Sequence, residues 1–125
     1  MTARGAEKAL EAGVSGIVVS NHGGRVLDHC PATAEVLPEI VDAVGGKLTI
    51  FVDGAIRSGM DMFKALALGA DAVLIGRPFV TTVYGGGEEG VQLYVQKLKA
   101  ELADTMRMCG AHSLAEIKRS MLFGF

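Results

Sequence analysis

The segment KALEAGVSGIVVS, residues 8–20, places a helical pattern, a glycine and an apolar strand in immediate succession, and KALALGADAVLIG, residues 64–76, repeats that order. A further strand pattern, residues 48–52, lies between the two units. Alternating helices and strands with short glycine-bearing joints are typical of parallel sheets. We therefore expect an α/β fold with three strands, belonging either to an open doubly wound sheet or to a (β/α)8 barrel.

The expected elements follow from apolar periodicity and from glycines at the helix ends. The first strand pattern is apolar on both faces, as expected for a strand that is covered on each side in a parallel sheet. Ser113 and Glu116 have the spacing of a helix-capping box, and Gly85, Gly86 and Gly87 predict a flexible turn. Helices are expected at residues 2–12, 33–44, 60–68, 88–108 and 113–121, and strands at residues 16–20, 48–52 and 72–75.

Charge and composition exclude several classes of function. A total of 12 Lys and Arg against 14 Asp and Glu gives a net charge of −2, so no basic stripe is available and we expect no nucleic-acid partner. No apolar run approaches the ~20 residues of a membrane-spanning helix, so we expect no membrane partner. The start of the chain lacks the apolar block of a secretory signal. The two cysteines, Cys30 and Cys109, lie far apart and do not have the spacing of a metal site. Scattered thiols suit a reducing compartment, and we expect a cytoplasmic protein.

Unusual polar residues follow the first strand in SNHGGRVLD, residues 20–28. Two glycines separate His22 from Arg25, and they allow a ligand to approach the backbone closely. A guanidinium binds a carboxylate through two parallel hydrogen bonds, and an imidazole can exchange a proton near neutral pH. The pair therefore suits a small hydroxy acid, although a His-x-x-Arg pair taken alone is more often a loop histidine and a solvated charge.

Two further loops follow the other strands, DGAIR at residues 53–57 and GRP at residues 76–78. Glycine-rich turns near helix starts present backbone N–H groups to anions, and each of these loops adds an arginine. In barrels, the loops after strands seven and eight commonly bind phosphate. Either motif alone usually marks an ordinary turn, but together they predict a phosphate site, in which each charge-assisted bond contributes roughly 1.5–3 kcal/mol.

In order and spacing, these motifs resemble the C-terminal portion of the FMN-dependent α-hydroxy-acid oxidases and dehydrogenases. That family includes glycolate oxidase, lactate oxidase and L-lactate dehydrogenase. The resemblance implies that the chain is the C-terminal part of a (β/α)8 TIM barrel, about strands 6–8 with their helices, and that residues 1–125 form a single partial domain. It extends from residue 5 to residue 121 and rests on SNHGGRVLD, PAT, LPEIV, VDGAIRSG, DMFKALALGA and VLIGRPF.

The resemblance also implies roles for individual residues. His22 matches the catalytic base that takes the substrate proton while the electrons of the α-carbon pass to FMN, and Arg25 matches the clamp for the substrate carboxylate. Ala55 stands where the family usually has glycine, so its methyl group narrows the expected phosphate turn. The implied FMN-binding residues are Ser20 at the flavin ring, Asp53 at the ribityl hydroxyls, Gly54, Ala55, Ile56 and Arg57 along the ribityl chain and phosphate, and Gly76 and Arg77 on the other side of the phosphate.

A complete barrel needs roughly 200 residues or more, and three strands taken from one leave two unpaired edges and an uncovered inner face. The mean hydropathy of +0.36 fits such exposure. We therefore expect part of a longer enzyme, or a truncated product of its gene, whose complete form oxidises a small L-2-hydroxy acid to the 2-oxo acid. The chain alone should have little or no turnover.

Its expected partners are the small 2-hydroxy acid and either the N-terminal barrel half or further copies of itself, because members of the family commonly form homo-oligomers. Two alternatives stay open. One is a noncatalytic remnant that retains only phosphate or flavin affinity or acts as an assembly partner. The other is a different phosphate-binding barrel, which would have no general need for a carboxylate clamp at Arg25.

Overall fold

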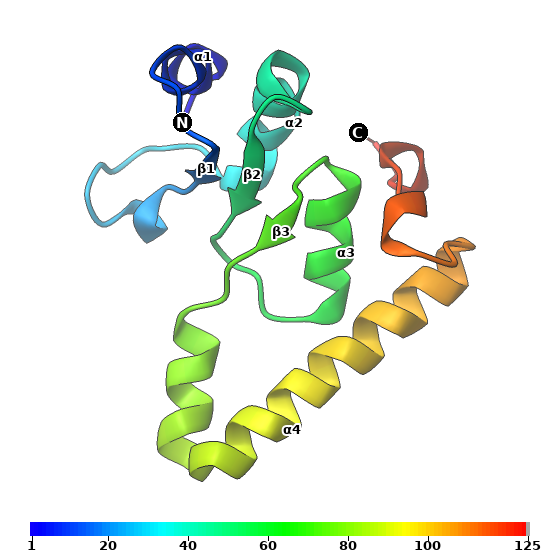
Figure 1. Cartoon of the computed structure of the whole chain (residues 1–125). Coiled ribbons are helices and arrows are strands. Elements are labelled where there is room, and N and C mark those ends of the chain that lie inside the picture. Colours follow the sequence, from blue (N-terminus) through cyan, green and yellow to red (C-terminus); the bar gives the residue numbers. More distant parts are fainter. Residues whose placement is uncertain (125) are drawn as a thin grey trace.

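A three-stranded parallel sheet forms the centre of the structure, a computed structural model that describes residues 1–124 (Figure 1). In the register, Ile17 pairs with Ile50, and Val52 pairs with Val73. The α/β fold with parallel strands is confirmed, although the third strand is shorter than the predicted residues 72–75. The elements in chain order are α1 (Ala3–Glu11), β1 (Gly16–Val19), η1 (His22–Gly24), α2 (Thr33–Val44), β2 (Thr49–Val52), α3 (Gly59–Ala67), β3 (Ala72–Val73), α4 (Arg77–Cys109), η2 (Leu114–Glu116) and η3 (Arg119–Met121).

One face of the sheet carries the hydrophobic core. Val19, Ile50 and Val52 share this face because alternate residues of a strand point the same way, and all three are buried. They form one cluster with apolar side chains of α1, α2 and α3, and in α2 these run from Leu37 to Val44 as the periodicity predicts. Burying each large aliphatic side chain stabilises the fold by about 1.5–3 kcal/mol.

The opposite face of the sheet is open. Val18 and Leu74 are 50% and 42% exposed, and Phe51, which pairs with Val18, is only partly buried. Within residues 1–124, β1 and β3 each have one edge without a strand partner. The uncovered face and free edges expected for part of a barrel are therefore present, whereas the cover on each side that the apolar pattern of β1 predicts is present on one face only.

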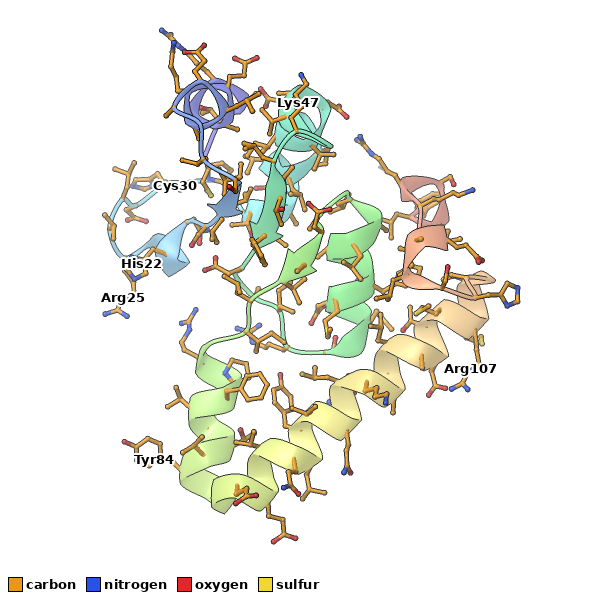
Figure 2. The ribbon with its side chains drawn as sticks, in the orientation of Figure 1. His22, Arg25, Cys30, Lys47, Tyr84 and Arg107 are labelled. Atoms are coloured by element: carbon orange, nitrogen blue, oxygen red, sulfur yellow. The ribbon has the colours of Figure 1, made fainter. Side chains whose placement is uncertain are left out.

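The helix α4 begins at Arg77, earlier than the predicted residue 88. Pro78 lies in its first turn, where a proline stabilises the start of a helix because no intrahelical N–H is needed there. Gly85 and Gly86, predicted as part of a turn, are helical. Tyr84, which precedes them, is 90% exposed and projects away from the rest of the molecule (Figure 2).

The chain changes direction at Gly87, where φ is 54° and ψ is −137°. Such a combination is essentially restricted to glycine, so the turn predicted from the glycine run is formed by its last residue alone. Beyond the turn, a Cβ atom on Gly90 would lie 2.5 Å from the carbonyl oxygen of Thr82. The two limbs of α4, residues 77–86 and 88–109, therefore form a helical hairpin whose limbs touch near the turn and diverge beyond it (Figure 1).

Two short 3-10 turns, η2 and η3, replace the single helix expected at residues 113–121. The capping-box prediction is wrong as well. The Ser113 hydroxyl donates to Glu116 Oε1 (3.2 Å), and the backbone N–H of His112 donates to Glu116 Oε2 (3.0 Å). The carboxylate thus closes a local turn, and the extended backbone of Ile117 ends that turn before a helix can form.

Replacing Gly87 with alanine tests the hairpin. Because a side chain at this φ and ψ is strained by roughly 1–3 kcal/mol, Gly87→Ala should lower the free energy of unfolding by that amount in urea titrations followed by circular dichroism. Gly85→Ala is the matched control, since Gly85 is helical and has open space around it, and this change should be neutral or stabilising by up to about 1 kcal/mol. Equal effects of the two substitutions would contradict the assignment of the turn to Gly87.

Candidate functional site

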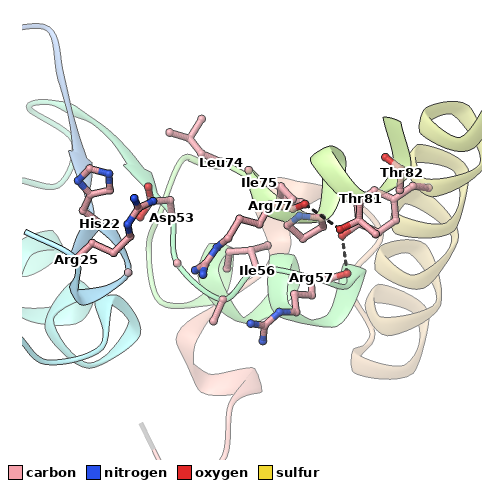
Figure 3. A pocket seen from close by; sticks show the side chains of 16 residues that line it. His22, Arg25, Asp53, Ile56, Arg57, Leu74, Ile75, Arg77, Thr81 and Thr82 are labelled. Carbon is pink, nitrogen blue, oxygen red and sulfur yellow. Dashed lines mark hydrogen bonds between the residues drawn. The ribbon is translucent and has the colours of Figure 1, made fainter. Parts of the chain in front are cut away.

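The polar loops that follow β1, β2 and β3 surround one open pocket of about 770 Å³ (Figure 3). The carboxyl ends of neighbouring parallel strands lie at the same edge of a sheet, where α/β proteins bind their ligands. Pockets of roughly 300–1,000 Å³ are usual for small molecules and cofactors. Of the predicted site residues, all but Ser20 line this pocket, namely His22, Arg25, Asp53, Gly54, Ala55, Ile56, Arg57, Gly76 and Arg77.

Local hydrogen bonds shape the loop after β1. The Ser20 hydroxyl oxygen accepts the backbone N–H of His22 (3.1 Å), so Ser20 orders the start of the loop without lining the pocket. Asn21 Oδ1 accepts the N–H of Gly23 (2.9 Å), and Asn21 Nδ2 donates to the carbonyl of Pro31 (3.3 Å). These bonds accompany a left-handed backbone at His22, with φ of 51°. Sequence reasoning gave Asn21 no role, although an Asn two residues before a glycine is a signal for a side-chain-bonded turn.

The loop after β2 passes through two left-handed residues, Gly54 with φ of 91° and Ala55 with φ of 59°. Thr33, buried at the start of α2, donates its hydroxyl to the carbonyl of Asp53 (2.6 Å). A Cβ atom on Gly54 would lie 3.1 Å from that hydroxyl oxygen. Thr33 therefore fixes the beginning of the loop, and sequence reasoning missed it because nothing in the local pattern links it to Asp53.

The N-terminus of α3 holds the end of the same loop. Asp61 Oδ2 accepts the backbone N–H groups of Arg57 and Ser58, both at 3.0 Å, and Ser58 Oγ accepts the N–H of Asp61 (3.1 Å). Burial raises the pKa of Asp61, but the hydrogen bonds from Ser58 and Arg57 outweigh this effect and leave the pKa below its ordinary value. The ionised carboxylate therefore orders the loop at neutral pH.

The pocket is rich in unpaired positive charge. None of the guanidinium groups of Arg25, Arg57 and Arg77 forms an ion pair within residues 1–124, and Asp53 is the only carboxylate among the described residues that line the pocket. A Cβ atom on Gly23 would lie 3.3 Å from Nη2 of Arg77, so the glycine leaves room for this side chain to reach the loop after β1. The arrangement suits a ligand with anionic groups.

The charged groups are spread along the pocket. In Figure 3, His22 and Arg25 lie at one end beside Asp53, whereas Thr81 and Thr82 lie at the other end. The helix α4 begins at the pocket with Arg77, and a helix N-terminus favours anions. One end of the pocket therefore combines a proton-exchanging group with a guanidinium, and the middle combines two guanidinium groups with the N-terminus of α4.

Fold and site together define the class of the chain. It is an α/β protein with a pocket at the carboxyl ends of parallel strands, and this pocket is large enough for a cofactor and suits an anionic ligand. The chain belongs to the FMN-dependent dehydrogenase family, because the model of that family matches residues 1–123. The family resemblance stated from the motifs is therefore confirmed, and FMN is the cofactor of the family.

Curated relatives cover nearly the whole chain. A peroxisomal (S)-2-hydroxy-acid oxidase from Oryza sativa subsp. japonica is 50% identical over 120 residues, which is 96% of this chain and 33% of that protein. An L-lactate oxidase from Roseobacter sp. (strain GAI101) is 48% identical over 96% of this chain and 32% of its own length. The chain thus spans about a third of the length of these relatives.

Solved structures show the same arrangement of elements. A mandelate oxidase variant with a monooxide FMN adduct superposes with a TM-score of 0.92 at 45% identity, covering 95% of this chain and 38% of that chain. Mandelate oxidase with benzoyl-formic acid gives a TM-score of 0.92 at 45% identity and covers 95% and 36% of the two chains. The prediction that the three strands are part of a TIM barrel is confirmed.

The comparisons do not support the expected cytoplasmic location. Several plant relatives are peroxisomal by name, which gives no support to the cytoplasmic location predicted from the sequence. Among residues 1–124, none of the helices is both long enough and apolar enough to cross a membrane.

Replacing Ala55 with glycine tests the strain in the loop after β2. A left-handed alanine is disfavoured by roughly 1–2 kcal/mol, and glycine loses about 0.5–1 kcal/mol more backbone entropy on folding. Ala55→Gly should therefore raise the free energy of unfolding by about 0.5–1 kcal/mol in urea titrations. Ala100→Gly, at an exposed helical position of α4, should lower it by about 1 kcal/mol. A loss of stability in both variants would contradict the strained conformation of Ala55.

Acid titration tests the role of Asp61. Since its pKa is lower in the folded chain than in the unfolded chain, its stabilisation is complete above the ordinary carboxyl pKa and disappears as pH falls through the lowered value. Asp61→Asn should therefore reduce the free energy of unfolding by about 0.5–1 kcal/mol at pH 7. The difference in this free energy between the variant and the wild type should become smaller below pH ~4. The measurement is urea unfolding at pH 7 and pH 3, and a gap that widens in acid would refute the assignment.

Proposed function

We propose that the chain supplies the part of an FMN-dependent enzyme that binds the cofactor phosphate and the substrate carboxylate, and that the complete enzyme oxidises a small L-2-hydroxy acid to the 2-oxo acid. The observation that carries this proposal is that His22, Arg25, Arg57 and Arg77 line a single pocket. The names of the relatives support the substrate class, since they are oxidases of (S)-2-hydroxy acids, L-lactate and mandelate.

The charges in the pocket match the charges of the two ligands. A 2-hydroxy acid carries one carboxylate, and FMN carries one phosphate. Arg25 shares a loop with His22, so it is the candidate partner of the substrate carboxylate. Arg77 lies at the N-terminus of α4, and Arg57 follows the glycine turn at Gly54; helix N-termini and glycine turns both favour phosphate. Two separate anion sites in one pocket therefore suit a substrate and a cofactor bound together.

The residues present fit FMN. Arg57 and Arg77, with Gly54 and Gly76, would hold the phosphate, because the two guanidinium groups have no other ion-pair partner within residues 1–124. Asp53 is the carboxylate that can accept hydrogen bonds from ribityl hydroxyls, and Ser20, Ala55 and Ile56 complete the proposed contacts with the ring and the chain. When bound, FMN supplies an acceptor for the two electrons that leave the α-carbon of the substrate.

His22 and Arg25 would perform the remaining chemistry. The guanidinium of Arg25 holds the substrate carboxylate and orients the α-carbon, and the imidazole of His22 takes a substrate proton as the electrons leave. Both residues are exposed in this chain, so water surrounds them and weakens electrostatic effects. We therefore propose that turnover requires additional structure that closes the pocket.

The open face of the sheet indicates what that structure is. A closed barrel of this class has eight strands, and the described part of this chain, residues 1–124, supplies three. A second copy would add only three more and could not complete the barrel, whereas the remaining five strands of a relative would pair with both free edges and cover Val18, Phe51 and Leu74. We propose this five-stranded part as the partner that makes the site active.

A chimera tests the function. The N-terminal two-thirds of the rice (S)-2-hydroxy-acid oxidase joined to this chain should bind FMN, and glycolate or L-lactate should bleach the bound flavin anaerobically. His22→Ala should slow flavin reduction by at least about 10²-fold while FMN stays bound. Arg25→Lys should chiefly raise the KM for the acid, because lysine cannot form the bidentate pair.

His29→Ala is the matched control, since His29 is a fully exposed histidine in the same loop and should leave reduction unchanged. Unaltered reduction in His22→Ala would remove the proposed base. A wild-type chimera that binds FMN but is reduced by no 2-hydroxy acid would refute the proposed oxidation and favour a remnant that retains only flavin affinity.

A further inference from the structure

The second limb of α4 packs across the start of α3 and reaches the loop that carries Arg57 (Figure 1). The hydroxyl of Tyr94 donates to the backbone carbonyl of Arg57 (2.8 Å). About two helical turns further along the limb, Glu101 Oε2 accepts the backbone N–H of Gly59 (2.9 Å). Two side chains from a distant part of the sequence thus bind backbone groups at the end of the loop and at the first residue of α3.

Close backbone packing fixes the distance between the limb and the loop. A Cβ atom on Gly59 would lie 2.2 Å from the backbone nitrogen of Leu102 and 2.5 Å from the carbonyl oxygen of Leu98. Only glycine leaves room for this approach. Because the two segments meet through backbone atoms, the side chains of the limb can reach the loop with little freedom to move.

The two binding side chains are themselves held in place. The ring of Tyr94 packs edge-on against Phe79 of the first limb, with ring centroids 5.1 Å apart and an interplanar angle of 71°. Lys97 Nζ lies 2.6 Å from Glu101 Oε1. The hydrogen bond from Lys97 lowers the pKa of Glu101, and burial raises the pKa of Tyr94. Near neutral pH, Glu101 is therefore an anionic acceptor and Tyr94 a neutral hydroxyl donor.

Arg57 is consequently bound at both of its backbone groups. Its N–H donates to Asp61 of α3 (3.0 Å), and its carbonyl accepts from Tyr94 of α4. Its guanidinium has no ion-pair partner within residues 1–124, and Arg57 is one of the residues that line the pocket (Figure 3). The backbone is anchored while the charged end stays available to a ligand.

We propose that Tyr94 is a positioning residue for the phosphate site: by fixing the carbonyl of Arg57, it sets where the Arg57 guanidinium meets the phosphate of the cofactor. The inference rests on the proposed function, in which Arg57 binds that phosphate. All groups involved lie within this chain, so the phosphate site is preformed and binds inorganic phosphate and FMN without the rest of the barrel, although more weakly.

The test uses the full chain and the variant Tyr94→Phe, which loses the hydroxyl but keeps the ring against Phe79. FMN and riboflavin binding are followed by flavin fluorescence, and inorganic phosphate binding by NMR titration of the amides of residues 54–58. Loss of one hydrogen bond predicts FMN and phosphate affinities about 3- to 10-fold weaker. Riboflavin lacks the phosphate, so its affinity should not change.

Tyr84→Phe is the matched control, because Tyr84 lies on the same helix and is 90% exposed, and it should alter none of the three affinities. Hydrogen exchange without ligand gives a second measurement, in which Tyr94→Phe should speed exchange at residues 54–58 only. Equal FMN and phosphate affinities in wild type and Tyr94→Phe would overturn the inference alone. Equal losses for FMN and riboflavin would also overturn it, since they would indicate general disorder. A wild-type chain that binds neither FMN nor phosphate would refute the phosphate site itself.

Discussion

Parallel pairing of β1, β2 and β3 in a single register is the constraint on which the site depends. Val19 pairs with Val52, and Val52 pairs with Val73, so the three strands end at the same level. The ladder continues to the first loop residues, where the N–H of Asp53 donates to the carbonyl of Val19 (3.2 Å) and the N–H of Leu74 to that of Val52 (2.9 Å). A one-residue slip would turn core side chains to the open face and separate the loops.

The same sheet has one face that helices cover and one face that is exposed. Helices cover one face and bury Val19, Ile50 and Val52 there, but Val18 and Leu74 remain about half exposed on the other. Covering a large aliphatic side chain is favourable by about 1.5–3 kcal/mol. Free strand edges add unpaired backbone groups. Covering this face is therefore favourable, and a partner with further strands satisfies both the apolar surface and the edges.

Features set by neighbouring residues could be predicted from the sequence, and features set by distant contacts could not. The strands, the first three helices and the polar loops follow from local periodicity and glycine positions. The hydrogen bonds from Thr33 to Asp53 and from Tyr94 to Arg57 join residues 20 and 37 positions apart, and no local sequence pattern predicts them. The early start of α4 runs against local propensity as well, because Gly85 and Gly86 are helical although glycine disfavours the interior of a helix.

The two ends of the pocket differ in how much of their support lies within this chain. Arg57 and Arg77 follow β2 and β3 and precede α3 and α4, and Tyr94 and Glu101 of α4 bind the backbone at Arg57 and Gly59. His22 and Arg25 follow β1, whose outer edge is free within residues 1–124, and both are exposed. A site built in this way separates two tasks: recognition of the phosphate depends on contacts inside the chain, whereas the environment of the reacting carbon depends on whatever pairs with the edge of β1. Differences in substrate among such enzymes can then arise on the far side of that edge without disturbing the phosphate end.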